Sequence, residues 1–366
     1  MTLTKGTRLN TERFMAQFLL IEWAEYDGLR VSKKLKEIKM KGKIGIEEHW
    51  SNEEFVVDGK PYFILEGKWE ESRERLMDVH GQRIEHMDAN GIEYTILSQT
   101  APAVQRIVDP TKAIESAKRS NDELAELVAK NPKRFGTFAQ LPLQDPDAAI
   151  KELHRCVKDL GVLGIMINGF SNVTDEEGML YYDLPQYWPF WAEVEKLDLP
   201  FYLHPRYSVP SVRRIYEGHQ WLIGAAWGFG VETATHALRL IGSGLFDKYP
   251  KLRIILGHLG EMIPFQIWRL TNRINGAPRG VKCKRSFQYY WENNFYVTTA
   301  GHCNLPAMQC CLSIMGDDKV IFSTDYPYET MKQAADWFDA VELGDVVKQK
   351  IGRDNAKRIF KLDFLS

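Results

Sequence analysis

The chain has 366 residues, of which 44% are hydrophobic and 26% charged, and its formal net charge at pH 7 is −2. This composition is typical of a globular protein with a large core, and the near-neutral charge argues against nucleic acid as a partner. The longest apolar run near the start, at 14–23, is too short to cross a bilayer and lacks the pattern of a secretory signal. Five cysteines without a CxxC spacing favour a reduced compartment. We therefore expect a cytoplasmic protein without a membrane anchor.

The first 39 residues differ in pattern from the rest of the chain. They predict one helix around 12–24, followed by a basic and polar stretch that ends near Met40. We interpret 1–39 as an N-terminal extension of unknown role and 40–366 as a single domain.

From Lys43 onward, apolar β-branched runs alternate with helical patterns. The expected strands lie at 43–49, 94–99, 136–141, 162–167, 200–204, 252–257, 295–299 and 319–324. The expected helices lie at 73–89, 111–130, 146–160, 189–197, 231–246, 261–275, 331–341 and 346–360. Eight strands, most of them followed by a helix, predict an α/β fold of the (β/α)8 TIM barrel type. The alternative is a doubly wound open sheet, although the early Gly-x-Gly-x-x-Gly fingerprint of a dinucleotide site is missing from the sequence.

Polar side chains that can bind a metal or transfer a proton stand at the ends of several expected strands. The first strand ends in Glu47 and His49, the fifth in His204, the sixth in His258, and the eighth in Asp325. Active sites of such barrels lie at the carboxyl ends of the strands. One histidine in such a place is more often a structural residue, but four strands with such ends indicate a functional constellation.

Four of these residues have the chemistry of a mononuclear metal site. Glu47, His49, His204 and Asp325 offer oxygen and nitrogen ligands for one divalent ion, and zinc, manganese and magnesium are all compatible with them. Because side chains alternate along a strand, we expect Glu47 and His49 to point one way and Glu48 the other. Glu48 is therefore expected to be structural.

A second group of residues is suited to proton transfer and to substrate binding. His258 is the candidate proton-transfer partner, Glu261 could hold its imidazole in one tautomer, and Asp325 could both ligate and shuttle a proton. Aromatic candidates for a ring pocket are Trp50, Tyr62, Phe63 and Trp227, although aromatic residues after strands are as often part of the core.

With these residues assembled, the sequence resembles the amidohydrolase superfamily, and within it the metal-dependent decarboxylases of hydroxybenzoic acids, such as the γ-resorcylate and 2,3-dihydroxybenzoate enzymes. The resemblance runs from Met40 to about Leu362 and rests on KIGIEEHW, TAPAVQ, LPLQDPDAA, LYYDLPQYWPFW, PFYLHPR, GLFDKYPKLRIILGHLGE, FSTDYPYE and IGRDNAKRIFKLD. Glu47-x-His49 replaces the His-x-His of general amidohydrolases, as it does in the γ-resorcylate enzymes. Asn168 stands near the end of strand four, where no bridging lysine is evident, which favours one metal over two.

The resemblance implies roles for individual residues. Glu47, His49, His204 and Asp325 would bind the metal, and His258 and Glu261 would form a relay with Asp325. Asn168 would contact the substrate, and Arg269 would lie near the substrate carboxylate, with a reach into a neighbouring subunit as one option. Family members form dimers and tetramers, so we expect a homodimer or homotetramer.

The implied reaction is the reversible decarboxylation of an ortho-hydroxybenzoic acid, such as 2,6- or 2,3-dihydroxybenzoate, to a phenol and carbon dioxide without an organic cofactor. Asp325, with His258 behind it, would protonate the ring carbon that bears the carboxylate, and the metal would stabilise the developing charge. Three alternatives stay open: an alkylated polyketide benzoate such as orsellinate as substrate, a metal-dependent lactone or amide hydrolase, and an inactive barrel that serves as an interaction protein.

Overall fold

The computed structural model describes residues 39–57, 60–61, 64 and 66–365. The helix predicted at 12–24 lies outside these residues, as do the pocket candidates Tyr62 and Phe63. At the start of the described chain, the backbone N–H of Met40 donates to Asp339 Oδ1 at 3.1 Å.

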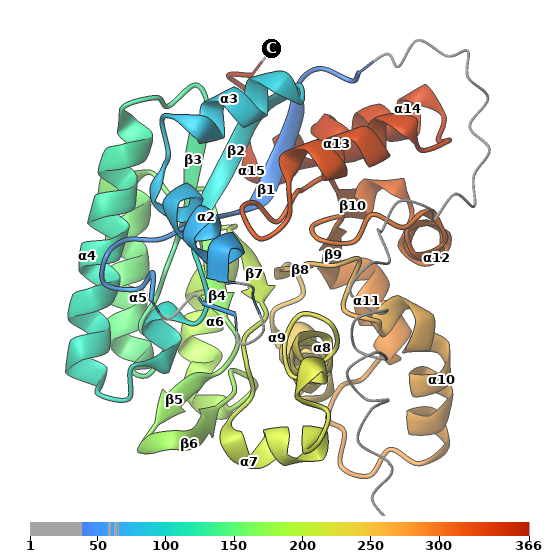
Figure 1. Cartoon of the computed structure of the whole chain (residues 1–366). Helices are drawn as coiled ribbons and strands as arrows, with labels where there is room; N and C mark the ends of the chain where they lie inside the picture. The colour runs from blue at the N-terminus through green and yellow to red at the C-terminus, as the bar shows by residue number, and fades with distance from the viewer. Residues whose placement is uncertain (1–38, 58–59, 62–63, 65, 366) are drawn as a thin grey trace, which may run out of the picture. The chain divides into compact units, whose positions relative to one another are not determined.

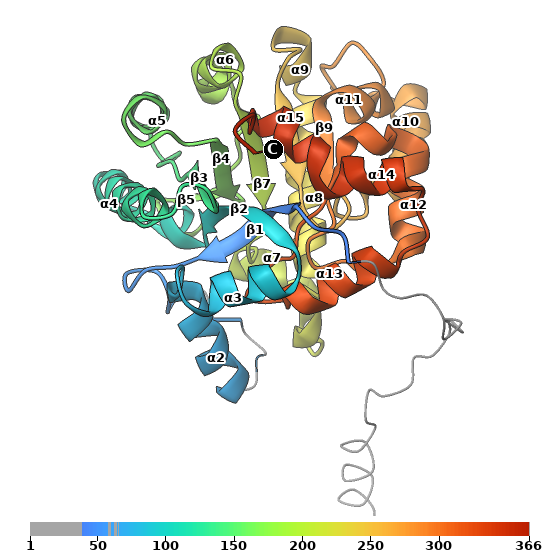
Figure 2. The ribbon, with the colours of Figure 1, turned by 90° about the horizontal axis from the view of Figure 1, so that it is seen from above.

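Eight parallel strands form a barrel (Figures 1 and 2). They are β1 (Lys43–Trp50), β2 (Ile92–Gln99), β3 (Phe135–Ala139), β4 (Gly164–Asn168), β7 (Pro200–His204), β8 (Arg253–Leu256), β9 (Phe295–Thr298) and β10 (Val320–Ile321), hydrogen-bonded in this order. The segment after β10 closes the ring on β1, since the Asp325 N–H donates to Glu47 O at 3.0 Å and the His49 N–H to Tyr326 O at 2.7 Å. The predicted TIM barrel is confirmed, and every expected strand overlaps an observed one.

Helices surround the strands, as the view along the barrel shows (Figure 2). They are α2 (Glu66–Met77), α3 (Gln82–Ala89), α4 (Pro110–Ala129), α5 (Pro146–Arg155), α6 (Trp188–Lys196), α8 (Gly228–Gly242), α10 (Ile263–Gly276), α11 (Phe287–Asn294), α12 (Leu305–Met315), α13 (Met331–Ala340), α14 (Asp345–Gln349) and α15 (Asn355–Phe360), with single turns at α7 (Pro210–Arg213) and α9 (Leu245–Lys248). The side chains of Asp109 and Asp145 cap α4 and α5, and a proline follows each of them in the first turn.

The structure differs from the expected elements in several places, of which three matter most. The helix predicted at 73–89 is two helices, because the Asp78 carboxylate accepts from the N–H groups of Gly81 and Arg83 and turns the chain between α2 and α3. The helices α11 and α12 were not predicted. A two-stranded antiparallel hairpin, β5 (Ser171–Val173) and β6 (Asp175–Leu180), follows β4 and was also missed.

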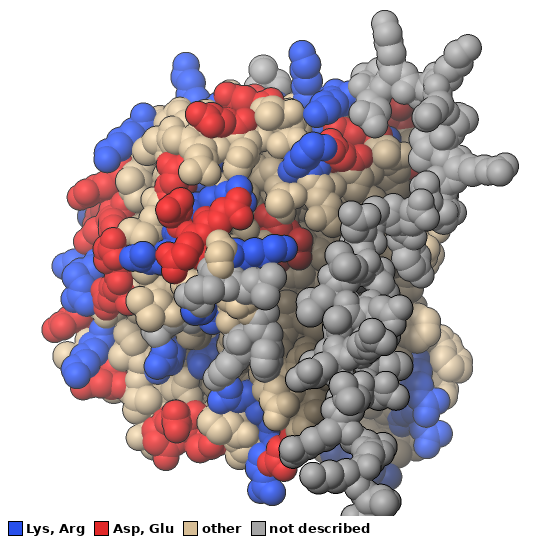
Figure 3. Space-filling model, viewed as in Figure 1, with Lys and Arg blue, Asp and Glu red and all other residues tan. Residues whose placement is uncertain are grey.

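Most buried apolar side chains belong to two clusters, and two smaller clusters lie beside them. One cluster fills the inside of the barrel and includes Ile46, Tyr94 and Tyr202, whereas a larger cluster lies between the strands and the surrounding helices and includes Trp191. On the face drawn in Figure 3, positive and negative side chains are interspersed. Among the described helices, none combines the length and the apolar character that crossing a membrane requires.

Candidate metal centre and active site

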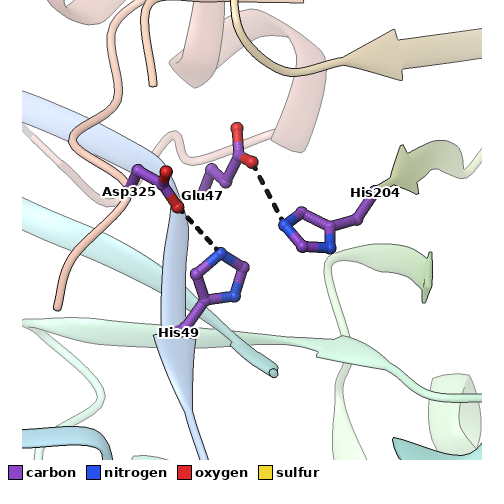
Figure 4. A group of neighbouring side chains, drawn as sticks. All are labelled: Glu47, His49, His204 and Asp325. Carbon is purple, nitrogen blue, oxygen red and sulfur yellow. Dashed lines mark hydrogen bonds and ion pairs between the residues drawn. The ribbon is translucent and has the colours of Figure 1, made fainter. Parts of the chain in front are cut away.

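The four predicted ligands, Glu47, His49, His204 and Asp325, lie together at the carboxyl end of the barrel (Figure 4). Each offers one ligand atom, and these four atoms lie within 4.8 Å of one another. His49 Nε2 is 3.1 Å from Asp325 Oδ1, and His204 Nε2 is 3.5 Å from Glu47 Oε1. The structure thus gathers residues from β1, from the end of β7 and from the segment that follows β10.

A β-bulge in β1 orients two of these predicted ligands, Glu47 and His49. The Cα pairing shows that β1 takes three steps from Gly45 to Glu48 while β2 takes two. Within this bulge Ile46 still belongs to the apolar interior of the barrel, whereas Glu47 and, beyond the bulge, His49 point into the site. Bulges of this kind occur at barrel rims and beside active sites, where they re-aim a side chain.

Glu48 points away from the ligand cluster, as its place in the strand predicts. Its Oε1 accepts from the Thr324 N–H at 2.9 Å and from Ser323 Oγ at 3.1 Å, and its Oε2 accepts from Thr324 Oγ1. Gly45 makes room for this carboxylate, because a Cβ at that position would overlap Glu48 Oε1. Burial raises the pKa of Glu48 to about 7, although the hydrogen bonds from Thr324 oppose the rise.

His204 is held in one tautomer. Its Nδ1 lies 2.9 Å from Asn168 Oδ1, and since the amide oxygen only accepts, Nδ1 carries the proton and Nε2 keeps a free lone pair. The Asn168 Nδ2 group donates in turn to the backbone oxygen of Gln99 at 3.3 Å. Burial holds the pKa of His204 well below its ordinary value, so the ring is neutral, as a metal ligand must be.

The two oxygens of Glu47 have different surroundings. Oε2 accepts from the Tyr202 hydroxyl and from Thr298 Oγ1, the latter at 3.0 Å, whereas Oε1 is buried and has no hydrogen-bond partner among the described residues. A buried oxygen without a donor is costly unless a ligand satisfies it. Burial raises the pKa of Glu47, although its neighbour His258 opposes the rise, and a divalent cation beside Oε1 would compensate the buried charge. This donor set therefore fits a metal ion.

Asp325 has a left-handed backbone conformation, with φ of 66°, and lies in the segment that follows β10. Its Oδ1 meets His49 and its Oδ2 lies 3.5 Å from His258 Nε2. Gly301 gives the carboxylate its space, because a Cβ there would lie 2.9 Å from Asp325 Oδ2. Burial alone would raise the pKa of Asp325, but the hydrogen bonds from His258 and His49 outweigh it and hold this pKa well below its ordinary value.

His258 and Glu261 form a close pair beside the ligand cluster. His258 Nδ1 lies 2.6 Å from Glu261 Oε1, and His258 Nε2 faces Asp325 and Glu47. The five residues from His258 to Met262 all have positive φ, and this left-handed turn brings the two side chains of the pair to one side. Burial by itself lowers the pKa of His258, but the charges of Glu261 and Glu47 raise it well above its ordinary value. A backbone this unusual is typical of functional sites.

An apolar cleft of about 1430 Å³ opens beside this pair. Trp227, Met262 and Phe265 contribute to its walls, and it reaches His258 and Glu261. It is lined by none of the four predicted metal ligands. The cleft therefore approaches the candidate proton-transfer pair from the side of α8, α10 and α12.

The predicted substrate contacts have different surroundings in the structure. Asn168 is buried behind His204 and positions that ring. Trp50 follows His49 on the opposite face of β1 and packs in the core outside the barrel, which corrects its assignment to the ring pocket. Arg269 lies exposed on α10, away from the ligand cluster of the same chain. Trp227 is half exposed at the apolar cleft, and Tyr62 lies outside the described residues.

Two residues that touch Glu47 were missed in the sequence. Tyr202 precedes His204 by two positions on β7, so both side chains point to the same side, and this spacing could have identified it. Thr298 ends β9, and a threonine at the end of an apolar strand gives little signal by itself. The ring of Tyr328, 5.7 Å from that of His49, forms a further wall of the site.

Comparison with known proteins gives one consistent family. A family model described as amidohydrolase matches residues 57–362. γ-Resorcylate decarboxylase from Rhizobium sp. (strain MTP-10005) is 51% identical over 327 residues, which cover 88% of this chain and 99% of that enzyme.

Solved structures agree with this result. A crystal structure of 2,6-dihydroxybenzoate decarboxylase in complex with 2,6-dihydroxybenzoate superposes with a TM-score of 0.86 at 51% identity and covers 88% of this chain and 100% of that one. A dihydroxybenzoic acid decarboxylase from Polaromonas sp. JS666, with bound manganese and 2-nitroresorcinol, also has a TM-score of 0.86, at 50% identity, with coverage of 88% and 98%. With this barrel, this ligand cluster and a family model that matches most of its length, the chain belongs to the amidohydrolase family.

Proposed function

We propose that this protein is a metal-dependent decarboxylase that converts 2,6-dihydroxybenzoate, or a close ortho-hydroxybenzoate, to the corresponding phenol and carbon dioxide. The observation that carries the proposal is the convergence of Glu47, His49, His204 and Asp325 in a chain that is half identical to γ-resorcylate decarboxylases along nearly their whole length. The reaction is reversible and needs no organic cofactor.

In this proposal the four clustered residues would hold one divalent ion. The ion would act as a Lewis acid that polarises the oxygens of the substrate. The manganese bound in the Polaromonas relative makes Mn²⁺ the first choice, with Zn²⁺ and Mg²⁺ as the alternatives to test. Carboxylate and imidazole ligands suit each of these ions to a different degree.

In this proposal Asp325, His258 and Glu261 carry out the proton transfer. Asp325 and His258 lie 3.5 Å apart, and Glu261 holds the far side of the imidazole. A proton passes from this group to the ring carbon that bears the carboxylate, the bond between the ring and the carboxylate then breaks, and its electron pair restores the aromatic ring as carbon dioxide leaves. Glu261 is buried, whereas the side chains of His258 and Asp325 keep 23% and 14% of their surfaces exposed, so a substrate can reach the group.

The test is a substrate panel on purified protein whose metal content is measured in the same sample. Carbon dioxide and an equal amount of the corresponding phenolic product are expected from 2,6-dihydroxybenzoate. The compounds 2,3-dihydroxybenzoate, salicylate and orsellinate serve as comparisons. Asp325→Asn should abolish turnover, and full activity in that variant would contradict the proposed proton donor. Hydrolysis of a lactone or amide panel without decarboxylation would favour the hydrolase alternative instead.

We further propose a homodimer or homotetramer that uses the outer face of α10. Phe265 and Trp268 lie one turn apart on this helix with 80% and 69% of their surfaces exposed, and the exposed Arg269 is next to them. Large exposed aromatic side chains with a polar rim are typical of subunit interfaces. A neighbouring subunit on this face would bring Arg269 close to a second chain.

Light scattering after size-exclusion chromatography tests this interface. Changing Phe265 and Trp268 together to glutamate should reduce the mass to that of one chain. Val346→Glu, at a site of similar exposure on α14, is the matched control and should leave the mass unchanged. An unchanged mass in the α10 double variant would contradict the proposal.

A cytoplasmic location is also proposed. All five cysteines of the chain are free thiols, which suits a reducing compartment. Fractionation of cells that express the protein, with a thiol-labelling assay of the purified fraction, tests it.

A further inference from the structure

The carboxylate of Glu47 is fixed by two hydroxyl groups on one of its oxygens. Oε2 contacts both the Tyr202 hydroxyl and Thr298 Oγ1, and these two hydroxyl oxygens are themselves 3.0 Å apart. The three oxygens form a triangle in which two protons are shared among three contacts. Oε1, on the other side of the same carboxylate, has no hydrogen-bond partner among the described residues and faces His204 Nε2 at 3.5 Å.

The two hydroxyl groups are held rigidly. Tyr202 and Thr298 are both fully buried, and the Tyr202 ring packs edge to face against Phe138 at 6.2 Å between centroids. Gly257 bounds the carboxylate from a third direction, since a Cβ there would lie 2.8 Å from Glu47 Oε2 and 2.9 Å from Oε1. The Glu47 carboxylate therefore has little room to rotate.

We infer that Tyr202 and Thr298 are positioning residues that make Glu47 a one-oxygen ligand, so that Oε1 alone faces the metal. This inference rests on the proposed metal site. Each of the four clustered residues then contributes a single atom, and a cation that prefers about six ligands keeps two places for an ortho-hydroxybenzoate. A Glu47 carboxylate free to bind through both oxygens would take one of these places.

The hydroxyl pair thus links metal affinity to substrate binding. Groups that orient a metal ligand commonly change metal affinity by about 10–100-fold when they are removed. Here the removal has a second expected effect, because a released Oε2 competes with the substrate for the same cation. A tyrosine or threonine that only filled space would show neither effect.

The experiment measures Mn²⁺ binding by the electron paramagnetic resonance signal of free Mn²⁺, without reference to turnover. Tyr202→Phe and Thr298→Val should each weaken Mn²⁺ binding about tenfold or more. Thr298→Ser keeps the hydroxyl and should bind within about twofold of the unaltered protein. Tyr187→Phe is the matched control, because it removes a buried hydroxyl that donates to Leu143 O, away from the metal cluster.

A second measurement addresses the one-oxygen ligand directly. With Mn²⁺ saturating, 2-nitroresorcinol should bind more weakly to Tyr202→Phe than to the unaltered protein or to Tyr187→Phe. Unchanged Mn²⁺ affinity in both Tyr202→Phe and Thr298→Val would overturn the positioning role. Weaker Mn²⁺ binding with unchanged 2-nitroresorcinol binding would overturn the one-oxygen assignment.

The failure of the proposed metal site gives a different result. If the unaltered protein binds no Mn²⁺, or if Glu47→Gln binds it normally, the site itself is wrong and the hydroxyl pair has no metal ligand to position. If Tyr202→Phe does not fold, Thr298→Val and Thr298→Ser supply the same comparison. Thermal unfolding of the metal-free variants checks the fold independently.

Discussion

The imidazole of His204 and the amide of Asn168 are joined by a hydrogen bond of 2.9 Å between Nδ1 and Oδ1. This contact decides which ring nitrogen of His204 is left for a cation, because the amide oxygen can only accept. It also joins the ends of two neighbouring strands, since Asn168 and His204 are paired in register on β4 and β7. Asn168, which is expected to touch the substrate, therefore also positions a candidate metal ligand.

Asn168→Ala should weaken Mn²⁺ binding by about 10–100-fold, because His204 would lose the acceptor that fixes its tautomer. The measurement is equilibrium dialysis of the purified variant against buffered Mn²⁺. Asn293→Ala, whose side chain donates to Tyr289 O on the surface of α11, is the control and should bind normally. Normal Mn²⁺ binding by Asn168→Ala would show that the contact is incidental.

Glu261→Gln should shift the pH profile of kcat/KM. The Glu261 carboxylate helps to raise the pKa of His258 above its ordinary value, so its neutral replacement should lower that pKa. The protonated imidazole would then be lost at lower pH, and the alkaline limb of the profile should move toward acid. Glu217→Gln, at an exposed site, should leave the profile in place. Mn²⁺ affinity should change little in either variant, and an unshifted profile in Glu261→Gln would argue against the relay.

Glu48→Gln should retain the metal and change how stability depends on pH. The folded pKa of Glu48 is about 7, above the ordinary value of 4.5, so the folded state binds the extra proton. Its contribution to stability is complete below pH 4.5 and is lost as the pH rises toward 7, by at most about 1.4 kcal/mol per pH unit. Urea unfolding of the metal-free protein between pH 5 and 7 should give a flatter dependence for Glu48→Gln. A variant that lost Mn²⁺ would mean that Glu48 belongs to the metal site.

Removal of the metal with a chelator should stop turnover and lower the melting temperature. A cation that binds only the folded state at 100 times its dissociation constant stabilises that state by about 2.7 kcal/mol. Calorimetry with and without Mn²⁺ measures the shift, and Mn²⁺ added back should restore both properties. Asp325→Asn should melt at nearly the same temperature with and without Mn²⁺. A large Mn²⁺-dependent shift in that variant would contradict its place among the ligands.

The barrel fold and the cluster of candidate ligands could be predicted from simple patterns in the sequence. Apolar runs mark the strands, and in a closed parallel barrel every carboxyl end faces the same rim, so Glu47, His204 and Asp325 could be expected together. The bulge in β1 was not visible in this way, because an extra residue in a strand shows only in its pairing with the neighbouring strand. It nevertheless explains how both Ile46 and Glu47 can point inward.

The remaining differences come from contacts between segments far apart in the chain. The spacing of Tyr202 to His204 places its side chain on the site's side of β7, but its contact with Glu47, 155 positions earlier, is visible only in the structure. Arg269 lies on the outside of its own chain, so its predicted place near a substrate depends on a neighbouring subunit. Trp50 was assigned by its position after His49, but alternation along the strand turns it outward.

The closure of the barrel between β1 and the segment after β10 has a consequence for how the protein is made. The hydrogen bond from the Asp325 N–H to Glu47 O joins parts of the chain that are synthesised at different times, and the candidate metal ligands lie in both parts. A nascent chain that ends before Asp325 has only three of the four ligands and an open sheet. Capture of Mn²⁺ should therefore report that the last strand has docked, and metal uptake would serve as a late checkpoint of assembly.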